Sequence, residues 1–140
     1  MDIHPELYYR IIDPLLESTR ERIYQQVPGN STVLDVACGT GSLVNHLADK
    51  CRHVTGVDLD EGMIQFANRK KKTNTDFYVL DARELSSYID KKFDVVIMSM
   101  AYHQFDPDDR FQILKEAGKV ASTIILSDYA YPDPSTLKQV

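Results

Sequence analysis

Three aspartates and two glycines have the types and the spacing that a small-molecule site requires. Asp35 precedes a Gly-x-Gly turn made by Gly39 and Gly41. Asp58 and Asp81 each end a further apolar segment. Glycines in such a turn tolerate positive φ and let a ligand approach the main chain, and a carboxylate can accept the paired hydroxyls of a ribose. The set predicts a nucleotide- or nucleoside-binding crevice.

The charge of Asp35 distinguishes between two kinds of ligand. A carboxylate is unfavourable beside a pyrophosphate, because like charges repel strongly where water is excluded. The fingerprint of NAD-binding turns also wants Gly or Ala three residues after the second glycine, and Val44 stands there. Asp35 therefore suits a ligand with a cationic amine and a sulfonium better than one with two phosphates.

The elements that must position these residues are strands alternating with helices. Apolar segments predict five strands, at 32–36, 53–58, 75–81, 93–100 and 122–130. Parallel strands need right-handed crossovers, so the alternation predicts an α/β fold with a doubly wound, Rossmann-like parallel sheet. Ligands bind outside the carboxyl ends of such strands, which is where the three aspartates would converge.

Two helices are expected before the first strand, and Asp13-Pro14 is interpreted as the cap and first turn of the second helix. We expect residues 1–140 to form a single domain, with an N-terminal helical cap over 1–29, a Rossmann-like core over 30–131 and a tail over 132–140. A later helix is expected to begin at Pro107, after Asp106 as its cap. Its sheet-facing residues would be Phe111, Leu114, Ala117 and Ala121.

Composition excludes several classes of function. The chain has 140 residues, 43% of them hydrophobic and 26% charged, and a net charge of −5, so it has no global cationic field to gather nucleic acid. No window approaches the ~18 apolar residues of a membrane helix, which makes a cytoplasmic location the expectation. The basic run 69–72 fits a helix end, and the acidic run 106–109 fits a helix start, so no metal site is predicted.

Four segments in this order resemble the motifs of the class I S-adenosylmethionine-dependent methyltransferases, particularly the small-molecule type related to the ubiquinone and menaquinone methyltransferases. They are VLDVACGTG (33–41), VTGVDLDEGMIQFA (54–67), YVLDARELS (78–86) and FDVVIMSMAYHQF (93–105). The resemblance runs from about Val33 to Tyr129. It implies a strand order of 3-2-1-4-5 and S-adenosylmethionine as the cofactor.

The resemblance also implies a set of cofactor-binding residues. Asp58 would accept hydrogen bonds from the ribose hydroxyls, and Asp81 would accept one from the adenine amine while the Ala82 N–H donates to the ring. Tyr8 and Tyr9 are candidates for part of a lid, although core packing is the expected role of at least one of them. The full set is Asp35, Ala37, Gly39, Gly41, Asp58, Leu59, Met63, Asp81, Ala82, Met98 and Ser99.

Catalysis of methyl transfer needs a base only where the acceptor holds a proton. His103 is the first candidate and Tyr102 the second, because both follow the fourth strand where the family places acceptor-side groups. The Asn/Asp-Pro-Pro-aromatic signature of nucleobase and amide methylation is replaced by SMAY (99–102). A small-molecule acceptor is therefore expected, and nucleic acid is not.

Family members normally continue beyond the fifth strand with a helix and an antiparallel strand pair, and this chain stops at Val140. The fifth strand is therefore expected to be an exposed edge through which the chain associates with a second copy or with a partner protein. Two rival functions stay open at this point. One is a non-catalytic cofactor-binding or partner-activating subunit, and the other is an NAD(P)-linked oxidoreductase.

Overall fold

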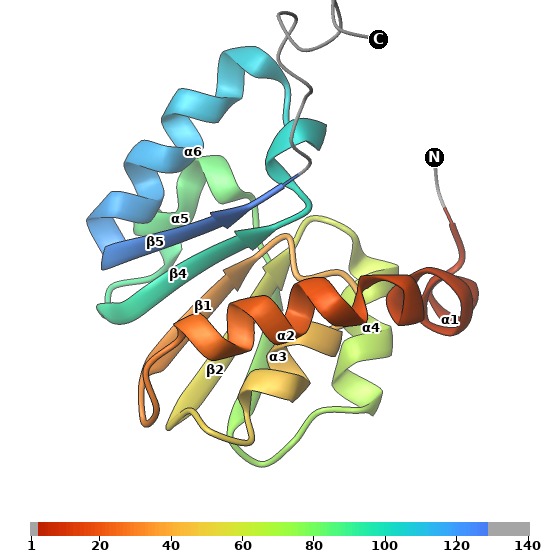
Figure 1. Cartoon of the computed structure of the whole chain (residues 1–140). Helices are drawn as coiled ribbons and strands as arrows, with labels where there is room; N and C mark the ends of the chain where they lie inside the picture. The colour runs from red at the N-terminus through yellow and green to blue at the C-terminus, as the bar shows by residue number, and fades with distance from the viewer. Residues whose placement is uncertain (1–2, 129–140) are drawn as a thin grey trace, which may run out of the picture.

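A five-stranded sheet forms the centre of the protein (Figure 1). The structure is a computed structural model and describes residues 3–128. The strands are β1 (Thr32–Val36), β2 (His53–Asp58), β3 (Thr75–Val79), β4 (Phe93–Ser99) and β5 (Ala121–Ser127). Their order is β3-β2-β1-β4-β5, and every neighbouring pair is parallel. The predicted α/β class and the order 3-2-1-4-5 are confirmed.

Strand β1 lies at the point where the strand order reverses. In the register of the sheet, Asp35 is level with Gly56 of β2 on one side and with Ile97 of β4 on the other. The chain passes from β1 outward to β2 and β3, and then returns to add β4 and β5 on the opposite side. Loops that leave β1 and β4 therefore separate at this position and open a crevice.

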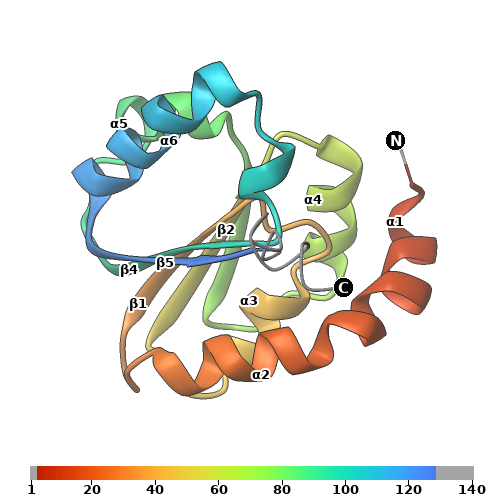
Figure 2. The same cartoon turned by 45° about the horizontal axis from the view of Figure 1, so that its top comes forward.

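Helices cover both faces of the sheet (Figure 2). One face carries α2 (Glu17–Gln26), α3 (Ser42–Leu47) and α4 (Glu61–Arg69), and the other carries α5 (Leu85–Tyr88) and α6 (Pro107–Val120). Two clusters of buried side chains form the core. The first lies on the α2–α4 side and includes Val33, Leu47 and Ile64. The second lies on the α5–α6 side and includes Leu34, Leu85 and Ile113. The adjacent β1 residues Val33 and Leu34 are thus fully buried on opposite faces of the sheet. This burial on both faces explains why the strands read as continuous apolar runs.

Helix α6 begins at Pro107 after Asp106, whose side chain accepts a hydrogen bond from the Asp108 N–H, as predicted. The expected inward position of Phe111 is wrong, because its side chain is 77% exposed. The buried residues of this helix include Ile113 and Ala117, which lie four residues apart on one face. Phe111 is two residues from Ile113, and on a helix that offset points to the opposite side.

The N-terminal residues form one helical run of changing pitch rather than two capped helices. It passes through α1 (Pro5–Leu7), the π-helix η1 (Tyr8–Ile12) and the 3₁₀-helix η2 (Asp13–Leu16) before α2. Asp13 is therefore not a helix cap, and its carboxylate bonds to the loop after β1 instead. Two further 3₁₀ turns are η3 (Ala82–Glu84) and η4 (Tyr102–Gln104).

The predicted tail at 132–140 and the last residues assigned to the core lie outside the described residues. Within residues 3–128, no helix combines the length and the apolar character needed to cross a membrane.

Candidate functional site

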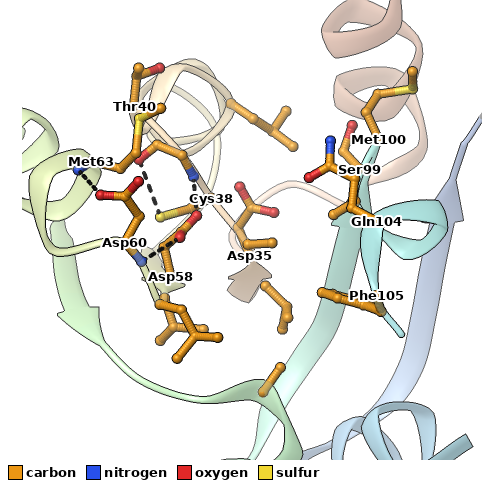
Figure 3. A pocket seen from close by; sticks show the side chains of 18 of the residues that line it. Asp35, Cys38, Thr40, Asp58, Asp60, Met63, Ser99, Met100, Gln104 and Phe105 are labelled. Carbon is orange, nitrogen blue, oxygen red and sulfur yellow. Dashed lines mark hydrogen bonds between the residues drawn. The ribbon is translucent and has the colours of Figure 1, made fainter. Parts of the chain in front are cut away.

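A cavity of about 950 Å³ lies at the carboxyl ends of the strands (Figure 3). Its walls come from the N-terminal run, the loop after β1, the ends of β2, β3 and β4, and the start of α6. Two arginines line it, Arg20 and Arg83, against a larger number of carboxylates. The carboxylates are Asp13, Asp35, Asp58, Asp60, Asp81, Asp106 and Asp109. Such an excess of one sign favours a cationic ligand.

The loop after β1 adopts left-handed backbone conformations at three alternate residues. The φ values are 61° at Ala37, 56° at Gly39 and 82° at Gly41. A positive φ is uncommon for a residue with a side chain, and such residues cluster at functional sites. Gly39 lines the cavity, and no atom lies within 4 Å of the place where its Cβ would sit. The main chain at Gly39 is therefore open to close approach by a ligand.

Gly41 has a different role from the one expected. It does not line the cavity, and a Cβ at this position would lie 2.7 Å from Cζ of Phe77 and 3.2 Å from Cβ of Ala67. The missing side chain lets the loop and the start of α3 pack against β3 and α4. Gly41 thus supports the site from behind.

Asp35 is buried, with only 3% of its surface exposed, and lines the cavity. Figure 3 shows its side chain between Asp58 on one side and Ser99 on the other. Burial, and then the nearby charge of Asp58, raise the pKa of Asp35 well above its ordinary value. Ionised Asp35 is therefore unfavourable in the empty cavity, and a cationic group placed beside it would relieve this cost.

Asp58 connects the end of β2 to the loop after β1. Its Oδ2 accepts a hydrogen bond from the Gly39 N–H at 2.8 Å, and its Oδ1 accepts one from the Asp60 N–H at 2.9 Å. Burial raises the pKa of Asp58 in spite of these bonds. Each carboxylate oxygen has acceptor capacity for a further hydrogen bond, so paired hydroxyls of a ligand could share this side chain with the main chain.

Asp81 and Ala82 both line the cavity beyond β3. The guanidinium of Arg83 donates to both carboxylate oxygens of Asp81 at 2.6–3.1 Å. This pairing holds the pKa of Asp81 below its ordinary value. A ligand amine at this position would therefore share the Asp81 carboxylate with the Arg83 guanidinium.

Leu59, Met63 and Ser99 also line the cavity, as do Ala37, Gly39, Asp35 and Asp58. Met98 does not, because it is fully buried in the second core cluster. Neighbouring residues of a strand point to opposite faces, and here Ser99 points toward the cavity while Met98 points into the core.

The two candidate bases lie in η4, outside the cavity lining, although the adjacent Ala101 and Gln104 belong to it. Nδ1 of His103 lies 2.6 Å from Oδ1 of Asp128, and the main-chain N–H of His103 donates to Oδ2 of the same carboxylate at 2.8 Å. Tyr102 packs into the second core cluster, with the Arg110 guanidinium 5.4 Å from its ring centre. Asp128 was not anticipated, although it follows β5 much as Asp81 follows β3.

Sequence reasoning also missed a polar junction between the N-terminal run and the loop after β1. Oδ2 of Asp13 accepts hydrogen bonds from Oγ1 of Thr40 at 2.5 Å and from Oγ of Ser42 at 2.6 Å. The sequence does show the two donors, because Thr40 and Ser42 flank Gly41. What the pattern could not give is their partner, because it lies 27 and 29 residues earlier in the chain.

Cys38 lies in the same loop, where burial and the charges of Asp35 and Asp58 raise the pKa of its thiol well above the ordinary value. A thiol that stays protonated is a poor nucleophile, so packing is its role. Within residues 3–128, no group of three or more His, Cys, Asp or Glu side chains is arranged to hold a metal ion.

Comparison with known proteins agrees with this geometry. The family described as "Methyltransferase domain" matches residues 33–123. A putative methyltransferase 235L of Invertebrate iridescent virus 6 is 38% identical over 74 residues, covering 51% of this chain and 27% of its own length. The demethylmenaquinone methyltransferase of Thermotoga maritima is 31% identical over 113 residues, covering 79% of this chain and 43% of its own length.

Among solved structures, a DhpI-SAM-HEP complex superposes with a TM-score of 0.79 at 20% identity, covering 97% of this chain and 65% of its own. The chain belongs to the methyltransferase-domain family of class I, S-adenosylmethionine-dependent enzymes, as the order of its motifs indicated. It spans less than half of the length of these curated relatives.

Proposed function

We propose that this chain binds S-adenosylmethionine in the 950 Å³ cavity and transfers the methyl group to a small-molecule acceptor. The observation that carries the proposal is the position of buried Asp35 beside Asp58 at the switch point of the sheet. A ligand with a sulfonium and an ammonium group offsets this concentration of negative charge, whereas a dinucleotide would add to it.

Each part of the cofactor has matching groups in the cavity. The open main chain at Ala37 and Gly39 faces its methionine part, and Asp58 has acceptor capacity for the ribose hydroxyls. Leu59, which is 66% exposed, and Met63 supply apolar surface for the adenine. The Asp81 carboxylate and the Ala82 N–H remain assigned to the polar edge of that ring, and Ser99 closes the opposite side.

Bound S-adenosylmethionine supplies a methyl group that its positive sulfur has already activated. The chain therefore contributes alignment of the acceptor, exclusion of water and, for an acceptor that holds a proton, a base. We assign the base to His103, with Tyr102 as the second candidate. The contact between Nδ1 and Asp128 supports this assignment, because a carboxylate at Nδ1 holds the neutral ring with its proton there and makes Nε2 the basic nitrogen.

A small-molecule acceptor is supported by the net charge of −5 and by the SMAY segment in the fourth motif. The relative named demethylmenaquinone methyltransferase supports the same class. The chemical identity of the acceptor and the methylated atom are the open part of the proposal. A cytoplasmic location stays a prediction from the sequence.

A second candidate function is a cofactor-binding subunit that transfers nothing until another polypeptide segment completes the acceptor side. The position of both candidate bases outside the cavity lining favours it. We also propose that β5 is a surface for self-association. Among the described residues it pairs only with β4, and its Ile124 and Leu126 side chains are 37% and 46% exposed.

Transfer of a labelled methyl group to a panel of small phenols, quinols, carboxylates and amines tests the proposed function. We expect one acceptor class to be methylated, and His103→Gln to slow the reaction by about 100-fold or more where the acceptor holds a proton. The affinity for S-adenosylhomocysteine should be unchanged in this variant. His53→Gln is the matched control, because His53 forms a similar pair with Asp76 at 2.9 Å at the opposite ends of the strands.

The results separate the candidates. Binding of the cofactor without transfer to any acceptor class would favour the cofactor-binding subunit. Full activity of His103→Gln on a proton-bearing acceptor would remove His103 from the catalytic role.

A further inference from the structure

The first part of the N-terminal run forms a wall of the cavity but contributes little to the core. Ile3, Tyr8 and Leu16 line the cavity. No residue of α1 or η1 is buried, and Leu7 and Ile11 are 50% and 54% exposed. The next helix, α2, is anchored differently, because its Ile23 is buried in the first core cluster. A segment with so few buried apolar contacts opens more easily than the core.

On the side away from the cavity, this wall contacts α4 and Lys70 through the partly exposed ring of Tyr9. The ring of Tyr9 packs on Phe66 of α4 with ring centres 5.3 Å apart, and Nζ of Lys70 lies 4.6 Å from the centre of the Tyr9 ring. Tyr9 is itself 38% exposed. Contacts of this kind at an exposed site are individually weak.

The buried carboxylate of Asp13 connects this segment to the residues that follow β1. It is 7% exposed, and its Oδ2 accepts both the Thr40 and the Ser42 hydroxyl hydrogen bonds. The two hydroxyl oxygens are 3.1 Å apart, so one carboxylate oxygen gathers both side chains. Hydrogen bonds to a charged acceptor are shorter and stronger than neutral ones. Thr40 belongs to the loop that carries Gly39, Ser42 is the first residue of α3, and both line the cavity, as Asp13 does.

The hydrogen bonds of Asp13 lie at an irregular point of the helical run. The π-helix η1 ends at Ile12, and the 3₁₀-helix η2 begins at Asp13. Short changes of helical pitch often mark hinges. A contact at this residue therefore controls whether the preceding residues lie against the cavity.

We propose that Asp13 is a positioning residue that latches the N-terminal wall to the loop after β1, so that closure of the wall and binding of the cofactor stabilise each other. The ligand named here rests on the proposed function, whereas the latch itself rests on the geometry of Asp13, Thr40 and Ser42. Because the loop and the first residue of α3 carry the latch donors next to the cofactor contacts, a change at either one shifts the equilibrium at the other by the same factor.

Asp13→Asn tests the latch, because it removes the charge and preserves the shape of the side chain. Amide hydrogen exchange should become about tenfold faster in residues 3–12 of the ligand-free variant, while the strands keep their protection. The affinity for S-adenosylhomocysteine should fall by about tenfold, and the ligand should restore less protection to residues 3–12 than in the parent protein. Glu17→Gln, an equivalent change at an exposed residue of the same run, should alter neither quantity.

Ser42→Ala removes one of the two hydrogen bonds and gives a second measurement should Asp13→Asn fold poorly. We expect a smaller effect on both readouts, and no further loss when Ser42→Ala is added to Asp13→Asn, because the two residues act as one unit. Unchanged exchange in residues 3–12 of ligand-free Asp13→Asn or Ser42→Ala would overturn the latch even if the affinity fell, because Asp13 itself lines the cavity. A parent protein that does not bind the ligand would refute the proposed function, and the ligand-free exchange would still decide the latch.

Discussion

The carboxylate of Asp58 holds the main chain of Gly39, with Oδ2 accepting the Gly39 N–H at 2.8 Å. This bond joins the end of β2 to the loop after β1, beside the switch point between β1 and β4 (Figure 3). The loop is therefore held by the same side chain that we assign to the ribose hydroxyls. A site assembled in this way before the ligand arrives avoids part of the ordering cost of binding.

Replacement of Asp58 by alanine should weaken the binding of S-adenosylhomocysteine by about 2–4 kcal/mol, because two hydrogen bonds to a charged acceptor are lost. The fold should survive, since the core clusters do not include this residue. Calorimetric titration measures the affinity, and circular dichroism checks the fold. Asp90→Ala, which removes an exposed carboxylate, serves as the control. Equal affinity in both variants would show that Asp58 ends the strand without binding the ligand.

Asp35 should make the empty protein less stable as the pH rises. Its pKa is raised in the folded state, so the folded protein holds this proton more tightly than the unfolded chain does. The stabilisation is present below the ordinary pKa, near 4, and is lost as the pH rises toward the folded value. Asp35→Asn mimics the protonated form and should raise the thermal unfolding midpoint by about 2–6 °C at neutral pH.

The same substitution should weaken the binding of S-adenosylmethionine by roughly tenfold, because a cationic ligand loses its charged partner. Unfolding scans of the parent and of Asp35→Asn between pH 4 and pH 8 measure the first effect, and the difference between them should grow with pH. A variant that is less stable than the parent at neutral pH, yet binds the ligand equally well, would contradict the assigned role.

Much of the fold could be predicted because parallel strands buried on both faces leave a strong apolar signal. The segment 93–100 is a clear case, and β4 occupies Phe93–Ser99. Side-chain direction within an element was harder to predict. Met98 and Ser99 were both assigned to the cleft, although adjacent strand residues point to opposite faces and Met98 is fully buried.

Gly41, after β1, and Gly118, in α6, give a matched pair of glycine substitutions. Gly41→Ala should destabilise the fold by about 1–3 kcal/mol, because φ is 82° and the new Cβ would overlap the Phe77 ring. Gly118→Ala, in α6 with no atom near the new Cβ, should stabilise it by about 0.5–1 kcal/mol. Urea unfolding of both variants is the measurement, and an unchanged midpoint for Gly41→Ala would show that Phe77 moves aside at little cost.

The β5 edge should produce association that depends on concentration. Sedimentation of the parent over a concentration series should show a reversible dimer, because Ile124 and Leu126 leave apolar surface at an edge that no other strand within residues 3–128 pairs. Leu126→Lys should shift the equilibrium toward monomer, while Tyr88→Lys, at a side chain that is 70% exposed on α5, should not. A parent that stays monomeric throughout would end this proposal.

Contacts between distant segments explain what sequence reasoning missed in the site. Asp13-Pro14 has the local pattern of a helix start, and only the fold shows that the carboxylate reaches Thr40 and Ser42. The pairing of His103 with Asp128 likewise depends on β5 lying beside β4. Local patterns identified strand ends and turns, whereas these bonds join residues 25 to 29 positions apart.

Calorimetry of the parent protein with three ligands tests the central claim most directly. We expect S-adenosylmethionine and S-adenosylhomocysteine to bind at micromolar concentrations and NAD(H) to give no signal, because a pyrophosphate would add negative charge to a cavity that already holds Asp35 and Asp58. Saturable binding of NAD(H) without any signal from S-adenosylmethionine would contradict the assignment and favour an oxidoreductase.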